Sequence, residues 1–340
     1  MPVHPLVAAR FPLLDGIPVP LIDGIPDFDE SLNNPEFIEQ FLAYAAPYSA
    51  YSMPNVHMRY LTIDGPLRPI PIRLYRPRSG GTDRPGLLWV HGGAFVTGQL
   101  DMTEAHVVSA ELAARGAVVA SVDYRLATRT LRYPAPLDDV DAARRWFSNA
   151  AAYLRTDASR LGIGGASAAG NLAAAATLRA RDGAARLPIA MLLGYPLLHF
   201  PVPALSDTLA AEMRELPRMV RFLPEDIVSI TRTYLGRLSD ISPQAMPGHA
   251  NLASLPATSI LLSEYDDLRS SGELFEEQLR DVQVPVVSTV AAGMLHGHLN
   301  LTPCGAMPEI ERSLDFLAEA LMPAEALRES DTPTRSPSAR

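Results

Sequence analysis

The stretch Gly165-Ala166-Ser167-Ala168-Ala169-Gly170 decides the fold of this chain. It follows a short apolar run and precedes an alanine-rich segment, which predicts a strand, a tight turn and a helix in succession. A serine held in such a turn by small neighbours, with its hydroxyl pointing outward, is the arrangement called a nucleophile elbow. The usual pattern is G-x-S-x-G, and Ala169 stands in place of its last glycine. A Gly/Ala-rich helix start without chemistry is therefore the alternative at this point.

A second glycine-containing stretch, His91-Gly92-Gly93-Ala94-Phe95, follows the apolar run Leu87-Leu88-Trp89-Val90. The apolar run predicts a buried strand, and the glycine pair lets backbone N–H groups of the following loop gather around one point. An oxyanion hole needs such donors to stabilise the negative oxygen that develops in acyl transfer. We expect the donors to be Gly93, Ala94 and Ala168, with Gly92 as a further candidate. An ordinary glycine turn is the alternative.

An acid and a base follow the serine in a meaningful order. Asp266 and its neighbour Asp267 come after the strand-like residues 258–262, and His296 comes after the strand-like residues 284–290. The order Ser, Asp, His, with each residue just beyond a strand, is that of the α/β hydrolases. Because the carboxyl ends of parallel strands meet at one edge of a sheet, we expect these side chains to lie close together.

These motifs together resemble the α/β-hydrolase superfamily, and within it the hormone-sensitive-lipase-like bacterial carboxylesterases. The resemblance extends from about residue 56 to residue 321, and it is carried by residues 91–95, 122–127, 133–135, 137–140, 165–171, 266–269 and 296–297. It implies a catalytic triad of Ser167, Asp266 and His296. It also implies that the N-terminal segment folds over the active site as part of a cap.

The sequence departs from the family pattern at four positions. Ala94 and Ala169 stand where the family usually has glycine, and Ala166 stands where an acidic residue is frequent. Asp267 replaces a common proline, so two adjacent aspartates compete for the role of the acid. The family motif places the acid two residues before the leucine, which is Asp266, and we expect position 267 to need no carboxylate.

Composition and charge restrict the possible partners. The chain has 340 residues, 47% of them hydrophobic and 20% charged, which suits one large α/β domain with a cap. The net charge of −9 and the lack of a Lys/Arg block argue against nucleic acid or a membrane surface as a partner. The single Cys304 excludes an internal disulfide and cysteine-based zinc sites. No signal-like start or 18-residue apolar run is present, so we expect a cytoplasmic protein.

Alternating strand-like and helix-like segments predict an α/β fold with a doubly wound, mostly parallel sheet. We expect a core of residues 55–200 and 246–322, a cap made from residues 1–54 and the insertion 201–245, and a disordered tail over residues 323–340. A helix is predicted over residues 35–51, with Phe37, Phe41 and Tyr44 on one face. Another is predicted over residues 101–115, with Asp101 and Glu104 as its capping pair. His298 is expected to be a solvated loop residue.

The predicted function is a serine carboxylesterase that hydrolyses short- to medium-chain esters through an acyl-enzyme, without metal or organic cofactor. The same triad could act on an amide, a lactone or a carbamate, because fold and motif do not separate these substrates. A non-catalytic ligand receptor on the same scaffold is a further alternative, which would require the loss of a triad member. The expected partner is a small-molecule ester, and the sequence leaves open whether the chain forms a homodimer.

Overall fold

The computed structural model describes residues 3–14, 21–22, 25–26, 35, 39 and 43–321. Phe37 and Phe41 of the predicted N-terminal helix, and the predicted disordered tail, lie outside these ranges. Within them, no helix combines the length and the apolar character that a membrane crossing requires.

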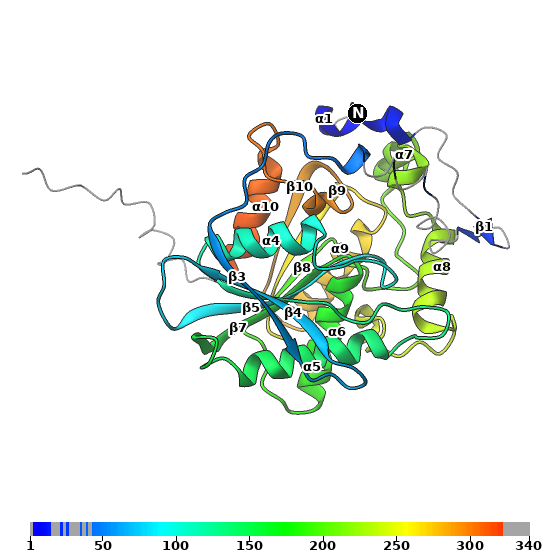
Figure 1. Ribbon diagram of the computed structural model, residues 1–340. Helices are drawn as coiled ribbons and strands as arrows, with labels where there is room; N and C mark the ends of the chain where they lie inside the picture. The colour runs from blue at the N-terminus through cyan, green and yellow to red at the C-terminus, as the bar shows by residue number, and fades with distance from the viewer. Residues whose placement is uncertain are drawn as a thin grey trace, which may run out of the picture.

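An eight-stranded sheet forms the centre of the described part of the chain (Figure 1). Its strands are β3 (Val56–Ile63), β4 (Ile70–Pro77), β5 (Arg84–Val90), β6 (Val118–Val122), β7 (Thr156–Ala166), β8 (Ala190–Gly194), β9 (Ala257–Tyr265) and β10 (Val286–Leu295). They lie in the order β10-β9-β8-β7-β5-β6-β4-β3, with β5 to β10 parallel and β4 antiparallel to both of its neighbours. The prediction of a doubly wound, mostly parallel sheet is therefore confirmed.

Helices cover both faces of the sheet (Figure 1). The major ones are α4 (Thr103–Ala114), α5 (Ala135–Asn149), α6 (Ala168–Asp182), α9 (Arg269–Asp281) and α10 (Pro308–Glu319). α4 and α10 pack on one face, and α5, α6 and α9 pack on the other. Strand β5 shows why its sequence is apolar throughout. Leu87 and Trp89 point into the first layer while Leu88 and Val90 point into the second, so both faces are buried.

The insertion between β8 and β9 carries two helices, α7 (Asp207–Arg214) and α8 (Pro224–Leu235), joined through the short helix η2 (Arg218–Val220). The N-terminal part lies against it: helix α1 (Pro5–Ala8) is drawn beside α7 in Figure 1, and Val7 shares a core cluster with Met213 of α7. Leu14, at the end of η1 (Phe11–Leu14), packs against Met219 of η2. The remaining elements are the two-stranded sheet β1 (Leu21–Ile22) and β2 (Ile25–Pro26), η3 (Pro247–His249) and η4 (His298–Asn300).

Among the strands of the main sheet and the helices that cover it, β8 and α9 were not predicted. Strand β7 is also longer than the short apolar run before Ser167, because the more polar residues 156–160 extend it beyond a register shift against β5. β8 is a five-residue apolar run between β7 and β9, too short for a periodic signal to identify.

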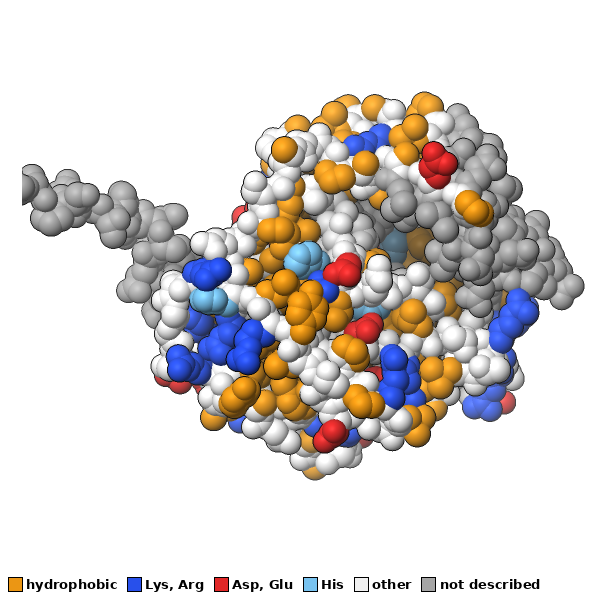
Figure 2. Space-filling model, in the orientation of Figure 1, with side chains coloured by type: hydrophobic (Ala, Val, Ile, Leu, Met, Phe, Trp, Pro, Cys, Tyr) orange, Lys and Arg blue, Asp and Glu red, His pale blue; other side chains and the backbone are white. Residues whose placement is uncertain are grey.

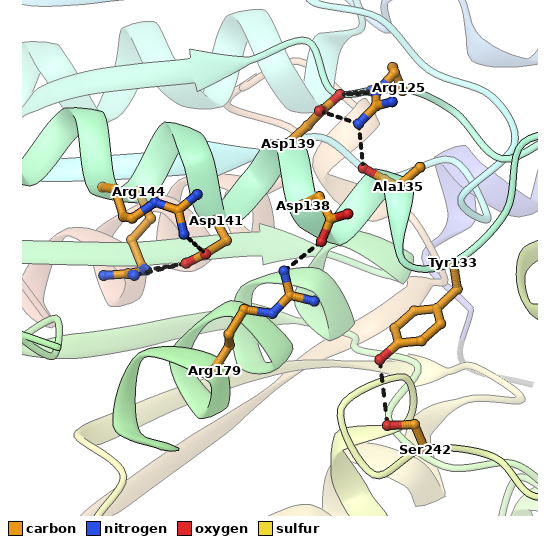
Figure 3. Close-up of polar contacts among 10 residues, drawn as sticks. Arg125, Tyr133, Ala135, Asp138, Asp139, Asp141, Arg144, Arg179 and Ser242 are labelled. Atoms are coloured by element: carbon orange, nitrogen blue, oxygen red, sulfur yellow. Dashed lines mark hydrogen bonds and ion pairs between the residues drawn. The ribbon is translucent and has the colours of Figure 1, made fainter. Parts of the chain in front are cut away.

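The motif residues around 125 and 139 have a structural role. Arg125 donates from Nε and Nη2 to the two carboxylate oxygens of Asp139, at 2.8 and 2.7 Å, and both side chains are buried (Figure 3). Nearby, the hydroxyl of Tyr133 lies 3.4 Å from Ser242 Oγ (Figure 3). The backbone N–H of Tyr133 donates to the carbonyl of Tyr234 in α8. The loop before α5 therefore connects the core to the insertion.

Arginine side chains gather at the amino ends of the parallel strands, the edge of the sheet opposite to the triad residues. Burial, and then the nearby charges of Arg155, Arg84 and Arg59, lower the pKa of Arg76. Figure 2 shows a group of Lys/Arg side chains on the left of the molecule. The fold thus collects arginines from four separate segments, which is why the sequence shows no basic block.

Candidate active site

Ser167 occupies a strained turn between β7 and α6. Its backbone has φ 56° and ψ −123°, a region that residues with a side chain rarely adopt. The small neighbours are required by close packing, since a Cβ on Gly165 would lie 2.7 Å from the carbonyl oxygen of Ala169. Ala169 itself is accommodated in the first turn of α6, fully buried. The departure from G-x-S-x-G therefore leaves the predicted strand–turn–helix arrangement in place.

The structure brings Ser167, His296 and Asp266 into one hydrogen-bonded chain. Ser167 Oγ lies 2.9 Å from His296 Nε2, and His296 Nδ1 lies 2.7 Å from Asp266 Oδ2. The other carboxylate oxygen of Asp266 accepts the backbone N–H of Leu268 at 2.8 Å. Each of the three residues directly follows a parallel strand, β7, β10 or β9, which is why they meet at one edge of the sheet.

The loop after β5 has an unusual backbone next to Ser167. Gly93, Ala94 and Phe95 have φ values of 116°, 52° and 66° in succession. No hydrogen bond to another described residue occupies the N–H groups of Gly93, Ala94 or Ala168. These three donors remain available to an oxyanion. Phe95 fixes the loop from the side of the insertion by stacking on Tyr234 of α8, with ring centroids 3.8 Å apart.

Gly92 does not fit the predicted role of an oxyanion donor, because its N–H donates to Glu104 Oε1 at 2.5 Å. Glu104 is completely buried at the start of α4, and its other oxygen accepts from the Tyr195 hydroxyl at 2.8 Å and from Asn300 Nδ2 at 3.4 Å. Burial raises the pKa of the Glu104 carboxyl, while these donors act in the opposite direction. One buried carboxylate thus connects the loop after β5, the end of β8 and the segment after His296.

The predicted capping pair of α4 is wrong. The residue before the helix is Met102, which makes no side-chain cap, and Asp101 instead pairs with Arg73 at 2.6 Å. Glu104 turns into the core rather than back toward the helix end, because Gly92, Tyr195 and Asn300 offer it donors there.

Two aromatic rings enclose the imidazole of His296. Tyr195, which follows β8, presents an edge at a centroid distance of 4.9 Å, and Phe222 from the insertion does so at 4.7 Å. Tyr195 also contacts the ring of His298 at 5.1 Å. The orientation of His296 is therefore restricted by packing as well as by its two hydrogen bonds.

Asp267 is engaged in an ion pair with Arg221 of the insertion, a partner that was not predicted. Both of its oxygens bind the guanidinium of Arg221, each at 2.8 Å, and Oδ2 also accepts the N–H of Phe222 at 2.8 Å. Asp266 and Asp267 thus point to different partners, as expected for adjacent residues. Asp266 contacts His296, and Asp267 contacts the insertion.

The other histidines near the site are structural. His298 was expected to be solvated, but it is 2% exposed and lies between Ser263 Oγ at 2.8 Å and Ser313 Oγ at 3.1 Å. Burial, and then the charge of His296, lower the pKa of His298 to about 3. His91 is buried beneath the loop after β5 and stacks on Tyr124, with ring centroids 4.6 Å apart.

Sequence reasoning missed Tyr195, Phe222 and Asn300. Tyr195 could have been found, because it directly follows an apolar run of the kind that precedes the other site residues. Phe222 stands in an irregular segment and Asn300 ends the short helix η4, and neither place carries a periodic or motif signal.

The chain is similar to known proteins of one fold family. Residues 87–300 match a family model described as alpha/beta hydrolase fold. The chain is 33% identical over 313 residues to the esterase LipI of Mycobacterium tuberculosis, covering 88% of this chain and 92% of the relative. It is also 33% identical over 281 residues to the carboxylesterase NlhH of the same organism, covering 78% of this chain and 83% of the relative.

Solved structures of esterases are also similar to this chain. A hyperthermophilic esterase from the archaeon Pyrobaculum calidifontis superimposes with a TM-score of 0.78 at 29% identity, over 94% of this chain and 98% of the other. A bacterial heroin esterase superimposes with a TM-score of 0.76 at 28% identity, with the same two coverages.

Proposed function

This chain belongs to the hormone-sensitive-lipase-like family of the α/β hydrolases and is a carboxylic ester hydrolase, and we propose that Ser167, His296 and Asp266 are its catalytic triad. The observation that carries the proposal is the pair of contacts Ser167 Oγ–His296 Nε2, at 2.9 Å, and His296 Nδ1–Asp266 Oδ2, at 2.7 Å. A nucleophile, a base and a residue that orients the base are thus in hydrogen-bond reach of one another.

The first half of the reaction forms an acyl-enzyme. His296 Nε2 takes the proton of Ser167, and Oγ attacks the carbonyl carbon of the ester. Asp266 holds Nδ1 protonated and stabilises the imidazolium that forms. His296 then gives its proton to the alcohol oxygen as the ester C–O bond breaks. The alcohol leaves, and the acyl group stays on Ser167.

The oxyanion of each tetrahedral intermediate is assigned to the N–H groups of Gly93, Ala94 and Ala168. Ala94 keeps a donor despite replacing the usual glycine, since only the side chain differs. Ala168 is the first residue of α6, where the helix end also favours negative charge. In the second half, water takes the place of the alcohol, and His296 deprotonates it as its oxygen attacks the acyl carbon. His296 then returns the proton to Ser167 Oγ as the bond between Oγ and the acyl group breaks, and the acid product leaves.

We assign a cap to residues 1–54 and 201–245, over a core of residues 55–200 and 246–322. Two observations support a cap built from both segments: Val7 belongs to the same buried cluster as Met213 of α7, and Leu14 packs against Met219 of η2. A cap limits the depth of the site, so the enzyme is expected to prefer acyl chains of roughly two to eight carbons, since each buried methylene adds about 0.8 kcal/mol only while there is room. A series of p-nitrophenyl esters measures this preference, and strong activation by long triglycerides at an oil–water interface would contradict it.

The test of the triad is the Ser167→Ala variant. It should lower kcat by on the order of 10⁵- to 10⁶-fold on p-nitrophenyl acetate. An organophosphonate should label the wild-type protein at Ser167 and leave the variant unlabelled. Full activity in a purified Ser167→Ala protein would overturn the proposal. Matched amide, lactone and carbamate substrates, measured with the same preparations, decide whether ester hydrolysis is the preferred reaction.

A further inference from the structure

We propose that Asp267, through its ion pair with Arg221, positions Phe222 as the wall of the alcohol side of the active site, so that this ion pair sets which leaving alcohols are accepted. The inference rests on the triad proposed above. It gives Asp267 the role of a positioning residue, and it gives Phe222 that of a specificity-determining one.

The ion pair is well formed and largely shielded from water. Arg221 Nε and Nη2 donate to Asp267 Oδ2 and Oδ1, each at 2.8 Å, so that two planar groups face each other. The side chains of Arg221 and Asp267 are only 12% and 10% exposed. Ion pairs in such surroundings are screened far less than surface pairs, and removal of one partner leaves the other charge poorly solvated. The contact therefore restricts the segment that carries Arg221.

The same carboxylate also holds the backbone next to Arg221. Asp267 Oδ2 accepts the N–H of Phe222 at 2.8 Å. Asp267 therefore binds both the side chain of Arg221 and the backbone of Phe222, the residue that carries the ring. Arg221 Nη1 further donates to the carbonyl of Met213 at the end of α7. This four-residue unit of Asp267, Arg221, Phe222 and Met213 links the loop after β9 to the insertion.

The two adjacent carboxylates thus both influence His296, one directly and one through Phe222. Asp266 binds His296 directly, and Asp267 anchors the segment whose ring packs edge-on against His296 at 4.7 Å. Tyr195, on the core side, is held instead by the hydrogen bond from its hydroxyl to Glu104, which belongs to α4. Phe222 is therefore the contact of His296 whose place depends on the Arg221–Asp267 pair.

The chemistry of the reaction says which part of the ester lies beside His296. The imidazole Nε2 hands the proton to the alcohol oxygen when the C–O bond breaks, so the alcohol group must lie next to the imidazole at that step. The acyl group stays attached to Ser167, and its oxygen faces Gly93 and Ala94. A ring packed on His296 therefore borders the alcohol part of the substrate rather than the acyl chain.

The experiment compares two series of esters. One keeps the acetyl group and varies the alcohol through methyl, butyl, cyclohexyl and benzyl acetate. The other keeps p-nitrophenol and varies the acyl chain. The variants are Asp267→Asn, Arg221→Gln, the double variant, and Phe222→Leu, which removes the ring without touching the ion pair. Glu273→Gln is the matched control, since it removes a different ion pair, Glu273–Arg269, just beyond the same loop.

We expect the ratio of kcat/KM between benzyl and methyl acetate to change by about fivefold or more in Asp267→Asn, Arg221→Gln and Phe222→Leu, as is usual when one wall of a pocket is altered. The acyl series should keep its profile, and Glu273→Gln should leave both series unchanged. The double variant should behave like the single ones, because the two residues act as one unit.

The result that overturns the inference is a uniform change, in which the alcohol and acyl series shift together or only the melting temperature falls. An unchanged alcohol series in Phe222→Leu has the same meaning, even if Asp267→Asn does not fold. These outcomes leave the triad intact, whereas an active Ser167→Ala protein would overturn the triad itself. The failures of the two proposals are therefore distinguishable.

Discussion

The buried carboxylate of Glu104 accepts the backbone N–H of Gly92 at 2.5 Å, next to the loop that carries the proposed oxyanion donors Gly93 and Ala94. A Cβ at position 92 would lie 2.7 Å from this carboxylate oxygen, so glycine is needed for the approach. Because Glu104 also binds Tyr195, a single side chain supports both the loop after β5 and a ring that contacts His296.

Replacement of Glu104 should therefore affect stability and catalysis together. Glu104→Ala leaves the Gly92 N–H and the Tyr195 hydroxyl without acceptors, which should cost about 1–3 kcal/mol for each buried group. Glu104→Gln keeps an acceptor oxygen and should lose less. Chemical denaturation and kcat on p-nitrophenyl acetate measure both effects. Glu111→Gln is the control, because Glu111 lies on the same helix and binds Tyr51 and Arg115 instead. Equal losses in the alanine and control variants would contradict the role.

The pH dependence of stability should also change in Glu104→Gln. Burial raises the pKa of the Glu104 carboxyl in the folded state. The contribution of Glu104 to the free energy of unfolding is therefore fully present below the unfolded pKa and is lost as pH rises through the folded pKa. The glutamine has no proton to lose. The free energy of unfolding of Glu104→Gln relative to wild type should increase as pH rises above the ordinary carboxyl pKa and through the raised pKa of Glu104. A constant difference across this range would show that Glu104 does not titrate as stated.

The two adjacent aspartates should differ sharply on substitution. Asp266→Asn should lower kcat on the order of 10⁴-fold, because the amide favours the wrong tautomer of His296. Asp267→Asn should lower kcat on p-nitrophenyl acetate by less than about tenfold, since that carboxylate binds Arg221 and not the imidazole. Steady-state kinetics on both proteins, with circular dichroism as the check on folding, decide this. An inactive Asp267→Asn protein together with an active Asp266→Asn protein would show that Asp267, and not Asp266, is the acid.

The loop after β5 should keep its shape with glycine at position 94 and should be distorted by alanine at position 93. Ala94 has φ 52°, so Ala94→Gly relieves a strain of about 1 kcal/mol that is offset by the greater freedom of glycine when unfolded. Its activity should stay near wild type, because the N–H donor is kept. A Cβ at Gly93 would lie 2.1 Å from the carbonyl oxygen of Thr97, so Gly93→Ala must distort the loop and lose most activity. An active Gly93→Ala would show that the loop shape matters little.

His298 should make the protein sensitive to mild acid. Its pKa is lowered to about 3 in the folded state, mainly by burial, and lies near 6.5 when unfolded. The stability it provides is present above the unfolded pKa and is lost as pH falls toward the folded pKa. The slope should reach about 1.4 kcal/mol per pH unit between roughly pH 6 and pH 4. Denaturation of wild type and His298→Gln over this range should give a shallower slope in the variant, and identical slopes would refute the assignment.

Local sequence signals determined the order and the places of the reacting groups. Small residues around Ser167, an apolar strand before each loop and the order Ser167, Asp266, His296 are all readable over a few neighbouring positions. In a parallel sheet such loops must meet at one edge, and the observed contacts of the three side chains agree with that expectation. The helix from Pro224 to the left-handed Gly236 is another feature of this local kind.

Tertiary structure alone decided what surrounds those groups. Glu104 carries a good capping pattern, yet it binds Tyr195, 91 positions away, because that buried hydroxyl needs a partner. Asp267 stands in a family position without chemistry, yet it meets Arg221, 46 positions away in the insertion. His298 resembles a loop residue, yet packing of η4 against Ser263 and Ser313 buries it. A local pattern specifies conformation along the chain, whereas these partners depend on how separate elements pack, and no single segment encodes that.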